Sequence, residues 1–202
     1  PDPLMSGGRM RYLPALDGIR AFAVLAVLAY HGGQTWAAGG YLGVDAFFVL
    51  SGFLITSLLL AERRQSGSID LRAFWMRRAR RLLPALFLVL GGVAVYAAFV
   101  AAPTELERIR ADGLGSLFSV ANWRFVFSQQ SYFEQFAAPS PLRHMWSLAI
   151  EEQFYLLWPL FVFGFLAWGK GAIRKLALAT GALALASLGL MIALHSPGTD
   201  PS

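Results

Sequence analysis

The sequence predicts an all-α fold: a polytopic transmembrane helical bundle of about five spans plus a re-entrant or interfacial helix. Of its 202 residues 56% are hydrophobic and 14% are charged, and the mean hydropathy is +0.54. Several stretches approach the roughly 20 apolar residues that a bilayer crossing needs. Cysteine is absent, so we expect neither a disulfide framework nor a thiolate metal site, and no metal site is predicted.

Lysine and arginine residues orient the expected spans. The segment between the first two spans carries neither residue, whereas the connection 61–81 carries seven arginines. The positive-inside rule therefore predicts a cytoplasmic N-terminus and a cytoplasmic 61–81 loop. Topology also explains the net charge of +5 better than nucleic-acid binding does. The expected spans are 13–35, 40–60, 82–102, 145–169 and 175–195.

A shorter apolar piece, 113–128, decides the number of crossings. If it crossed the bilayer, the cations Lys170, Arg174 and Lys175 would lie outside, against the positive-inside rule. We therefore expect 103–144 to be an external segment with a re-entrant or interfacial helix. An ordinary crossing is the alternative.

The first span carries Arg20 and His31, which are separated by ten uncharged residues. Eleven helical steps place them on nearly the same stripe, roughly 16 Å apart along the axis. Ionisable groups at membrane depth are costly and usually mark a pathway or a site. The structural alternative for Arg20 is a pair with Asp17, three residues earlier.

The second span has one charge, Asp45, near its outer end. This carboxylate can orient His31 so that one ring nitrogen accepts a proton; alternatively it only stabilises the helix start. Ser51 and Gly52 are small residues that let helices approach closely. We do not expect Ser51 to be a nucleophile, because it lies mid-span with no base within reach in the sequence.

The fourth span carries adjacent carboxylates, Glu151 and Glu152. Neighbouring helical residues point about 100° apart, so at least one carboxylate faces the bundle interior. His144 lies on the same face as Glu151. A buried Glu151 can act as an acid or base or bind a hydroxyl-rich ligand. Structural pairing with Arg143 or Arg124 is the alternative.

An RRARR run directly precedes the third span. Arginines beside a span are ordinary topology determinants, but four guanidiniums within five residues exceed that need. They can bind phosphate on lipid headgroups or on a phosphorylated cofactor. The arginines are Arg77, Arg78, Arg80 and Arg81.

Four segments resemble, in order, the motifs of the membrane-bound acyltransferase-3 family: LDGIRAFAVLAVLAYH, GGYLGVDAFFVLSGFLI, FWMRRARRLLPA and HMWSLAIEEQFYLLWP. Its bacterial members O-acetylate lipopolysaccharide, peptidoglycan or exopolysaccharide. The resemblance implies an enzyme of the bacterial cytoplasmic (inner) membrane. Such an enzyme takes an acyl group, typically acetyl, from acyl-CoA inside and passes it, directly or through a relay, to a hydroxyl of an extracytoplasmic glycan. No tightly bound cofactor is implied.

The resemblance also implies roles for individual residues. The family's Arg/Lys-X10-His motif falls on Arg20 and His31, with His31 as general base and Arg20 holding the donor or the tunnel geometry. Glu151 would position the acceptor or His31, and Asp45 matches the acidic position of the second motif. The Arg-X-X-Arg motif, which would grip CoA phosphates, fits either Arg77 with Arg80 or Arg78 with Arg81.

Family members usually have about twice as many spans, often followed by a soluble esterase-like domain. We therefore expect 1–202 to be the N-terminal part of an acyltransferase domain. Its expected partners are acyl-CoA, a cell-surface or lipid-linked glycan, membrane lipids and the C-terminal half of the same domain, with no nucleic acid. The alternatives are a proton-coupled transporter or a catalytically silent fragment.

Overall fold

The computed structural model describes residues 5–6, 9–10, 13–127, 140–167 and 171–194. These residues confirm the all-α prediction, apart from a small hairpin in which β1 (Met5–Ser6) pairs antiparallel with β2 (Arg9–Met10). The helices are α1 (Pro14–His31), α2 (Leu42–Ser66), α3 (Leu71–Phe99), α4 (Leu106–Leu117), α5 (Ala121–Phe127), α6 (Met145–Ala167) and α7 (Ala172–Leu194), with 3-10 turns at Thr35–Ala37 and Pro103–Glu105.

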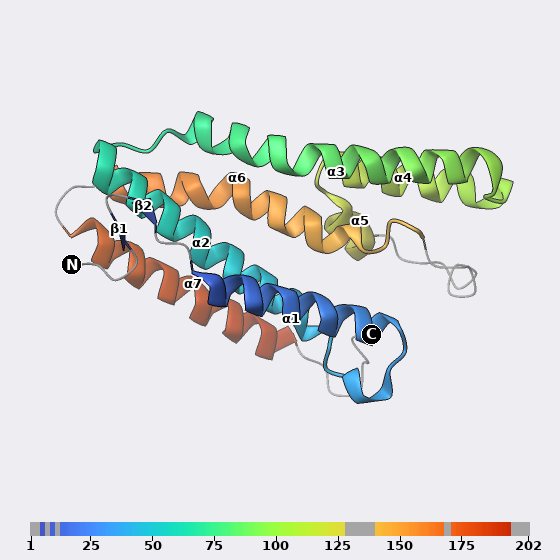
Figure 1. The fold of residues 1–202 in the computed structure, drawn as a ribbon, viewed down its shortest axis with the longest axis horizontal. Helices are drawn as coiled ribbons and strands as arrows, with labels where there is room; N and C mark the ends of the chain where they lie inside the picture. Colours follow the sequence, from blue (N-terminus) through green and yellow to red (C-terminus); the bar gives the residue numbers. More distant parts are fainter. Residues whose placement is uncertain (1–4, 7–8, 11–12, 128–139, 168–170, 195–202) are drawn as a thin grey trace. The chain divides into compact units, whose positions relative to one another are not determined.

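Five segments among the described residues are long and apolar enough to cross a membrane, as the sequence predicts. They are α1, α2 with its preceding 3-10 turn, α3, α6 and α7. The chain folds as two compact units, residues 1–159 and residues 160–202. The first unit holds α1 to α5 and most of α6, and Figure 1 shows the course of these helices. The second holds the end of α6 and all of α7.

The prediction of a loop over 61–81 is wrong in one respect, because most of this connection is helical. Helix α2 continues to Ser66 and ends at Gly67, which adopts φ +75° and donates its N–H to the Arg63 carbonyl. Helix α3 begins after Asp70, whose Oδ1 accepts the Ala73 N–H at 2.9 Å. Hydropathy locates an apolar window, but these caps decide where the helices end. The RRARR arginines therefore lie on the second and third turns of α3 with helical spacing.

Glycines bring α1 and α2 into backbone contact. A Cβ atom added at Gly40 would lie 2.2 Å from the Ala26 carbonyl oxygen, and one at Gly43 would lie 2.5 Å from the Ala23 carbonyl oxygen. Small residues permit such close approach between membrane helices. At Gly52 an added Cβ would meet only the Phe154 ring, at 3.8 Å, so the tightest contacts lie nearer the start of α2 than the sequence suggested.

Helix α6 contacts both α2 and α3 within the first unit. The Trp158 indole N–H donates to Thr56 Oγ1 of α2 at 2.8 Å. The Trp75 indole N–H of α3 donates to the Tyr155 carbonyl at 3.1 Å. These bonds satisfy indole donors in an apolar interior and fix which side of α6 faces each neighbour.

A short helical hairpin, α4 and α5, docks on α6 through its turn. Ser119 adopts φ +56° there, and its hydroxyl donates to Glu152. The Gln153 amide donates to the Ser119 carbonyl at 2.6 Å and to Asn122 Oδ1 at 2.8 Å. In the described part of 103–144 no helix has the length of a span. The interfacial or re-entrant position of this hairpin stays a prediction.

A buried ion pair ties α4 to α5. Arg124 Nε lies 2.7 Å from Asp112 Oδ1, and the Asp112 side chain is only 3% exposed. Arg124 therefore pairs with Asp112 rather than with Glu151, which corrects one structural alternative drawn from the sequence.

Candidate functional site

A cavity of about 780 Å³ lies between α1, α2 and α3. Three of the four RRARR arginines line it, and Arg80 does not. Arg81 lies three positions after Arg78 and four after Arg77, spacings that share a helix side, and all three arginines face the cavity. The other charged lining residues are Asp17, Arg20 and Glu62.

The cationic residues of this cavity differ in their partners. Arg20 Nη1 lies 3.6 Å from Asp17 Oδ1, and Arg77 Nη2 lies 3.6 Å from Glu62 Oε2. Neither Arg78 nor Arg81 forms an ion pair with any carboxylate of the described residues. The Arg78 guanidinium instead lies over the Tyr155 ring, 5.1 Å from its centroid. Arg78 and Arg81 are therefore the two guanidiniums with charge left to offer an anion.

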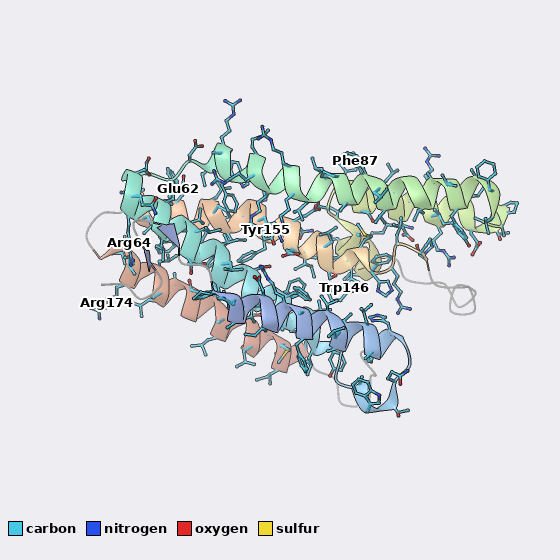
Figure 2. The ribbon with its side chains drawn as sticks, viewed as in Figure 1. Glu62, Arg64, Phe87, Trp146, Tyr155 and Arg174 are labelled. Carbon is cyan, nitrogen blue, oxygen red and sulfur yellow. The ribbon has the colours of Figure 1, made fainter. Side chains whose placement is uncertain are left out.

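A smaller cavity of about 200 Å³ adjoins the first. Arg20, Leu54, Arg78 and Arg81 line both, so the two spaces share a wall of arginines. The smaller cavity extends to Ser51, Glu151 and Tyr155. In Figure 2, Tyr155 marks this position on α6, and Trp146 marks the beginning of the same helix.

Glu151 is the centre of a hydroxyl cluster inside the smaller cavity. Its Oε1 accepts the Ser51 hydroxyl at 2.5 Å and also the Tyr155 hydroxyl. The two hydroxyl oxygens lie 3.3 Å apart. Ser51 is 7% exposed and Tyr155 is 8% exposed. Glu152 points to the Ser119 turn instead, so the adjacent carboxylates diverge as the sequence predicts.

A pair of histidines lies where α1 ends and α6 begins. The His31 and His144 rings are 4.7 Å apart between centroids and nearly perpendicular, at 84°. His31 Nδ1 lies 2.9 Å from the Val27 carbonyl oxygen. A carbonyl only accepts hydrogen bonds, so Nδ1 carries the hydrogen and Nε2 of the neutral ring keeps its lone pair.

His144 precedes α6 and titrates below the ordinary range for histidine. Its partial burial lowers the pKa, and the neighbouring His31 and Arg143 lower it further. Both causes disfavour the charged imidazolium. His144 therefore stays neutral to lower pH than a free histidine does.

The structure does not join the expected outer cluster by direct contacts. Among the described residues, neither Asp45 nor Glu151 forms a hydrogen bond or ion pair with His31. Asp45 lies exposed in the first turn of α2, where the helix dipole favours a carboxylate. Glu151 lines the smaller cavity together with Arg20, Arg78 and Arg81. The catalytic roles expected of His31, Asp45 and Glu151 stay predictions.

Two further residues of the site, Tyr155 and Ser51, were not among the site candidates drawn from the sequence, which argued against Ser51 as a nucleophile. Tyr155 lies four positions after Glu151, a spacing that places both on one helix face and could have identified it. The partnership of Ser51 with Glu151 has no sequence signal, because the residues are separated by 100 positions. Only the packing of α2 on α6 brings them together.

Comparisons with known proteins show the family of this chain. Residues 13–201 match the acyltransferase-3 family, described as an acyltransferase domain. The chain is 50% identical over 192 residues to the peptidoglycan O-acetyltransferase OatA of Listeria monocytogenes. It is 45% identical over 185 residues to the O-acetyltransferase OatA of Staphylococcus aureus. These matches cover 95% and 92% of this chain but only 30% of each relative. No solved structure matches the chain. The protein is therefore a member of the acyltransferase-3 family.

Proposed function

We propose that the protein is a membrane O-acyltransferase that passes an acetyl group from acyl-CoA to a hydroxyl of an extracytoplasmic carbohydrate. The observation that carries the proposal is the separation of two kinds of chemistry along α1. An arginine-lined cavity lies around Arg20, and an imidazole with a free lone pair lies at His31, about 16 Å away along the helix. Relatives named as peptidoglycan O-acetyltransferases support both the acetyl group and the glycan acceptor.

The donor in this proposal binds in the larger cavity. Its volume of about 780 Å³ falls within the range of small-molecule sites. Arg78 and Arg81 bind CoA phosphates there, because their charge is not neutralised by a carboxylate of the described chain. Arg80 points outside the cavity lining and takes no part. Of the two possible Arg-X-X-Arg assignments, this geometry favours Arg78 with Arg81.

The acceptor hydroxyl in this proposal meets His31. Because Nδ1–H is committed to the Val27 carbonyl, Nε2 is available to remove the hydroxyl proton. His144 beside it, kept neutral by its lowered pKa, does not repel the imidazolium that forms. Asp45 of the following helix makes no hydrogen bond or ion pair with His31, so in this scheme its charge favours the imidazolium only through space.

The proposed orientation puts the arginine cavity on the cytoplasmic side of the inner membrane and His31 on the outer side. It rests on the cation distribution, since the α2–α3 connection is rich in arginine and the α1–α2 connection has none. The chain contains no cysteine, so single cysteines at Ser68 and Gln34 report the two sides. A membrane-impermeant maleimide added to intact cells should label Gln34→Cys and not Ser68→Cys.

The function is tested by incubating labelled acetyl-CoA with membranes that contain the full-length protein and identifying the labelled glycan. His31→Ala should abolish transfer while membrane insertion is unchanged. Arg78→Ala should raise the acetyl-CoA concentration needed for half-maximal rate by about tenfold or more, since hydrogen bonds to charged groups contribute about 1.5–3 kcal/mol. Arg80→Ala is the matched control and should behave as the parent protein.

Two results would count against the proposal. If transfer proceeds equally well in His31→Ala, His31 is not the general base. If Arg78→Ala and Arg80→Ala have equal effects on the acetyl-CoA requirement, Arg78 does not bind the donor and the arginines act only as topology determinants.

A further inference from the structure

We infer that Ser51 is an acyl-accepting nucleophile: it carries the acetyl group as a covalent ester between donor and acceptor. The inference rests on the proposed function and divides it into two chemical steps. Its basis is the juxtaposition of a buried serine hydroxyl, a carboxylate and the arginine-lined donor space.

The structure places a base, Glu151, beside Ser51. The serine hydroxyl donates to Glu151 Oε1 at 2.5 Å, within the range of charge-assisted O–H···O⁻ hydrogen bonds. A serine is activated as a nucleophile by an adjacent group that takes its proton. The Tyr155 hydroxyl donates to the same oxygen and so holds the carboxylate in place. No base lies near Ser51 in the sequence, but α6 brings Glu151 to it from 100 positions away.

Ser51 also lies on the donor side of the proposed path. It lines the smaller cavity together with Arg20, Arg78 and Arg81, which line the donor cavity as well. His31 lines neither cavity. An acyl group entering past the arginines therefore meets the Ser51 hydroxyl before it can reach the imidazole. If Ser51 carries the acyl group as an ester, the thioester itself has a shorter distance to reach.

The two steps balance without any further reactant. In the first, Ser51 Oγ attacks the thioester carbonyl and Glu151 takes the hydroxyl proton. The C–S bond breaks, and the thiolate leaves with the proton from Glu151 as the CoA thiol. In the second, the acceptor hydroxyl attacks the Ser51 ester. The new ester forms on the acceptor as the C–O bond to Ser51 breaks; His31 takes the proton of the acceptor hydroxyl, and Glu151 delivers that proton to Ser51 Oγ.

The surroundings suit an ester intermediate. Ser51 is only 7% exposed, which limits water that would hydrolyse the ester. The Arg78 guanidinium lines the same small space. It can donate hydrogen bonds to an oxyanion as it develops on the thioester carbonyl.

The test uses the full-length protein in membranes and labelled acetyl-CoA. In His31→Ala the second step is blocked, so label should accumulate on the peptide that contains Ser51, as located by mass spectrometry after acid quench. Ser51→Ala added to His31→Ala should abolish that label. Ser51→Ala by itself, in a protein that keeps His31, should lower glycan transfer by about a thousandfold or more. Ser57→Ala, six residues along the same helix, is the control and should retain both signals.

The Ser51→Cys variant tests whether the loss of activity in Ser51→Ala is merely a structural effect of losing the hydroxyl. It should take up acetyl as a thioester, which neutral hydroxylamine releases far faster than an oxygen ester. Glycan transfer that persists in Ser51→Ala, with no label on Ser51 in His31→Ala, overturns the relay but leaves the proposed function standing. Absence of CoA-dependent glycan transfer in the parent protein overturns both.

Discussion

The α1–α2 contact predicts that Gly43→Ala will destabilise the protein and displace the donor site. The added Cβ would lie 2.5 Å from the Ala23 carbonyl oxygen and 2.8 Å from Val27 Cγ2. Ordinary Cβ contacts begin near 3.4 Å, so the helices must separate by about 0.9 Å. One of the two nearest atoms belongs to backbone, so a side-chain rotation cannot relieve the clash.

The magnitude follows from two opposing terms. Overpacking a well-filled contact costs about 1–3 kcal/mol, whereas replacing glycine by alanine inside a helix gains up to about 1 kcal/mol. Gly43 is the second residue of α2, so little of that gain is available. We expect a net loss of about 1–2 kcal/mol in the free energy of unfolding. Because Arg20 lies on α1 and Ser51 on α2, acetyl transfer should fall as well.

The assay is reversible unfolding of the purified protein in mixed micelles, followed by helical circular dichroism. Gly92→Ala is the matched control, since an added Cβ there has no described atom within 4 Å, and it should be neutral or stabilising. If Gly43→Ala is as stable as Gly92→Ala and transfers acetyl at the parent rate, the close helix contact does not exist as described.

Two further predictions concern the α4–α5 hairpin and His144. Arg124→Ala should lower the free energy of unfolding by about 3–5 kcal/mol, because it leaves a buried carboxylate without its partner. Asp112→Ala should lower it less, because the Arg124 side chain is 33% exposed. Unfolding in mixed micelles measures both variants, and a larger loss in Asp112→Ala would contradict the burial argument. The lowered pKa of His144 means that the unfolded chain binds its proton first. Stability should therefore fall as pH drops below about 6.5, and His144→Gln should weaken that dependence in thermal unfolding; a parent-like acid sensitivity in the variant would exclude His144 as its source.

The amino-acid sequence by itself determined the membrane-helical fold. Apolar length identifies spans because a bilayer has a fixed thickness, and five such segments are present. The sequence also indicated Arg20, His31 and the RRARR run as site candidates, because charges beside or inside apolar segments are conspicuous. It further predicted that Glu151 and Glu152 diverge, since helix geometry alone requires it.

Only the tertiary structure decided which charges share a site. A span in lipid is apolar on its outer and inner faces alike, so periodicity does not show how each helix is rotated about its axis. Packing of α2 on α6 gives Ser51 its carboxylate. The rotation of α3 turns Arg78 and Arg81 toward the cavity and leaves Arg80 outside its lining. These pairings join residues far apart in the chain, and no spacing within one helix encodes them.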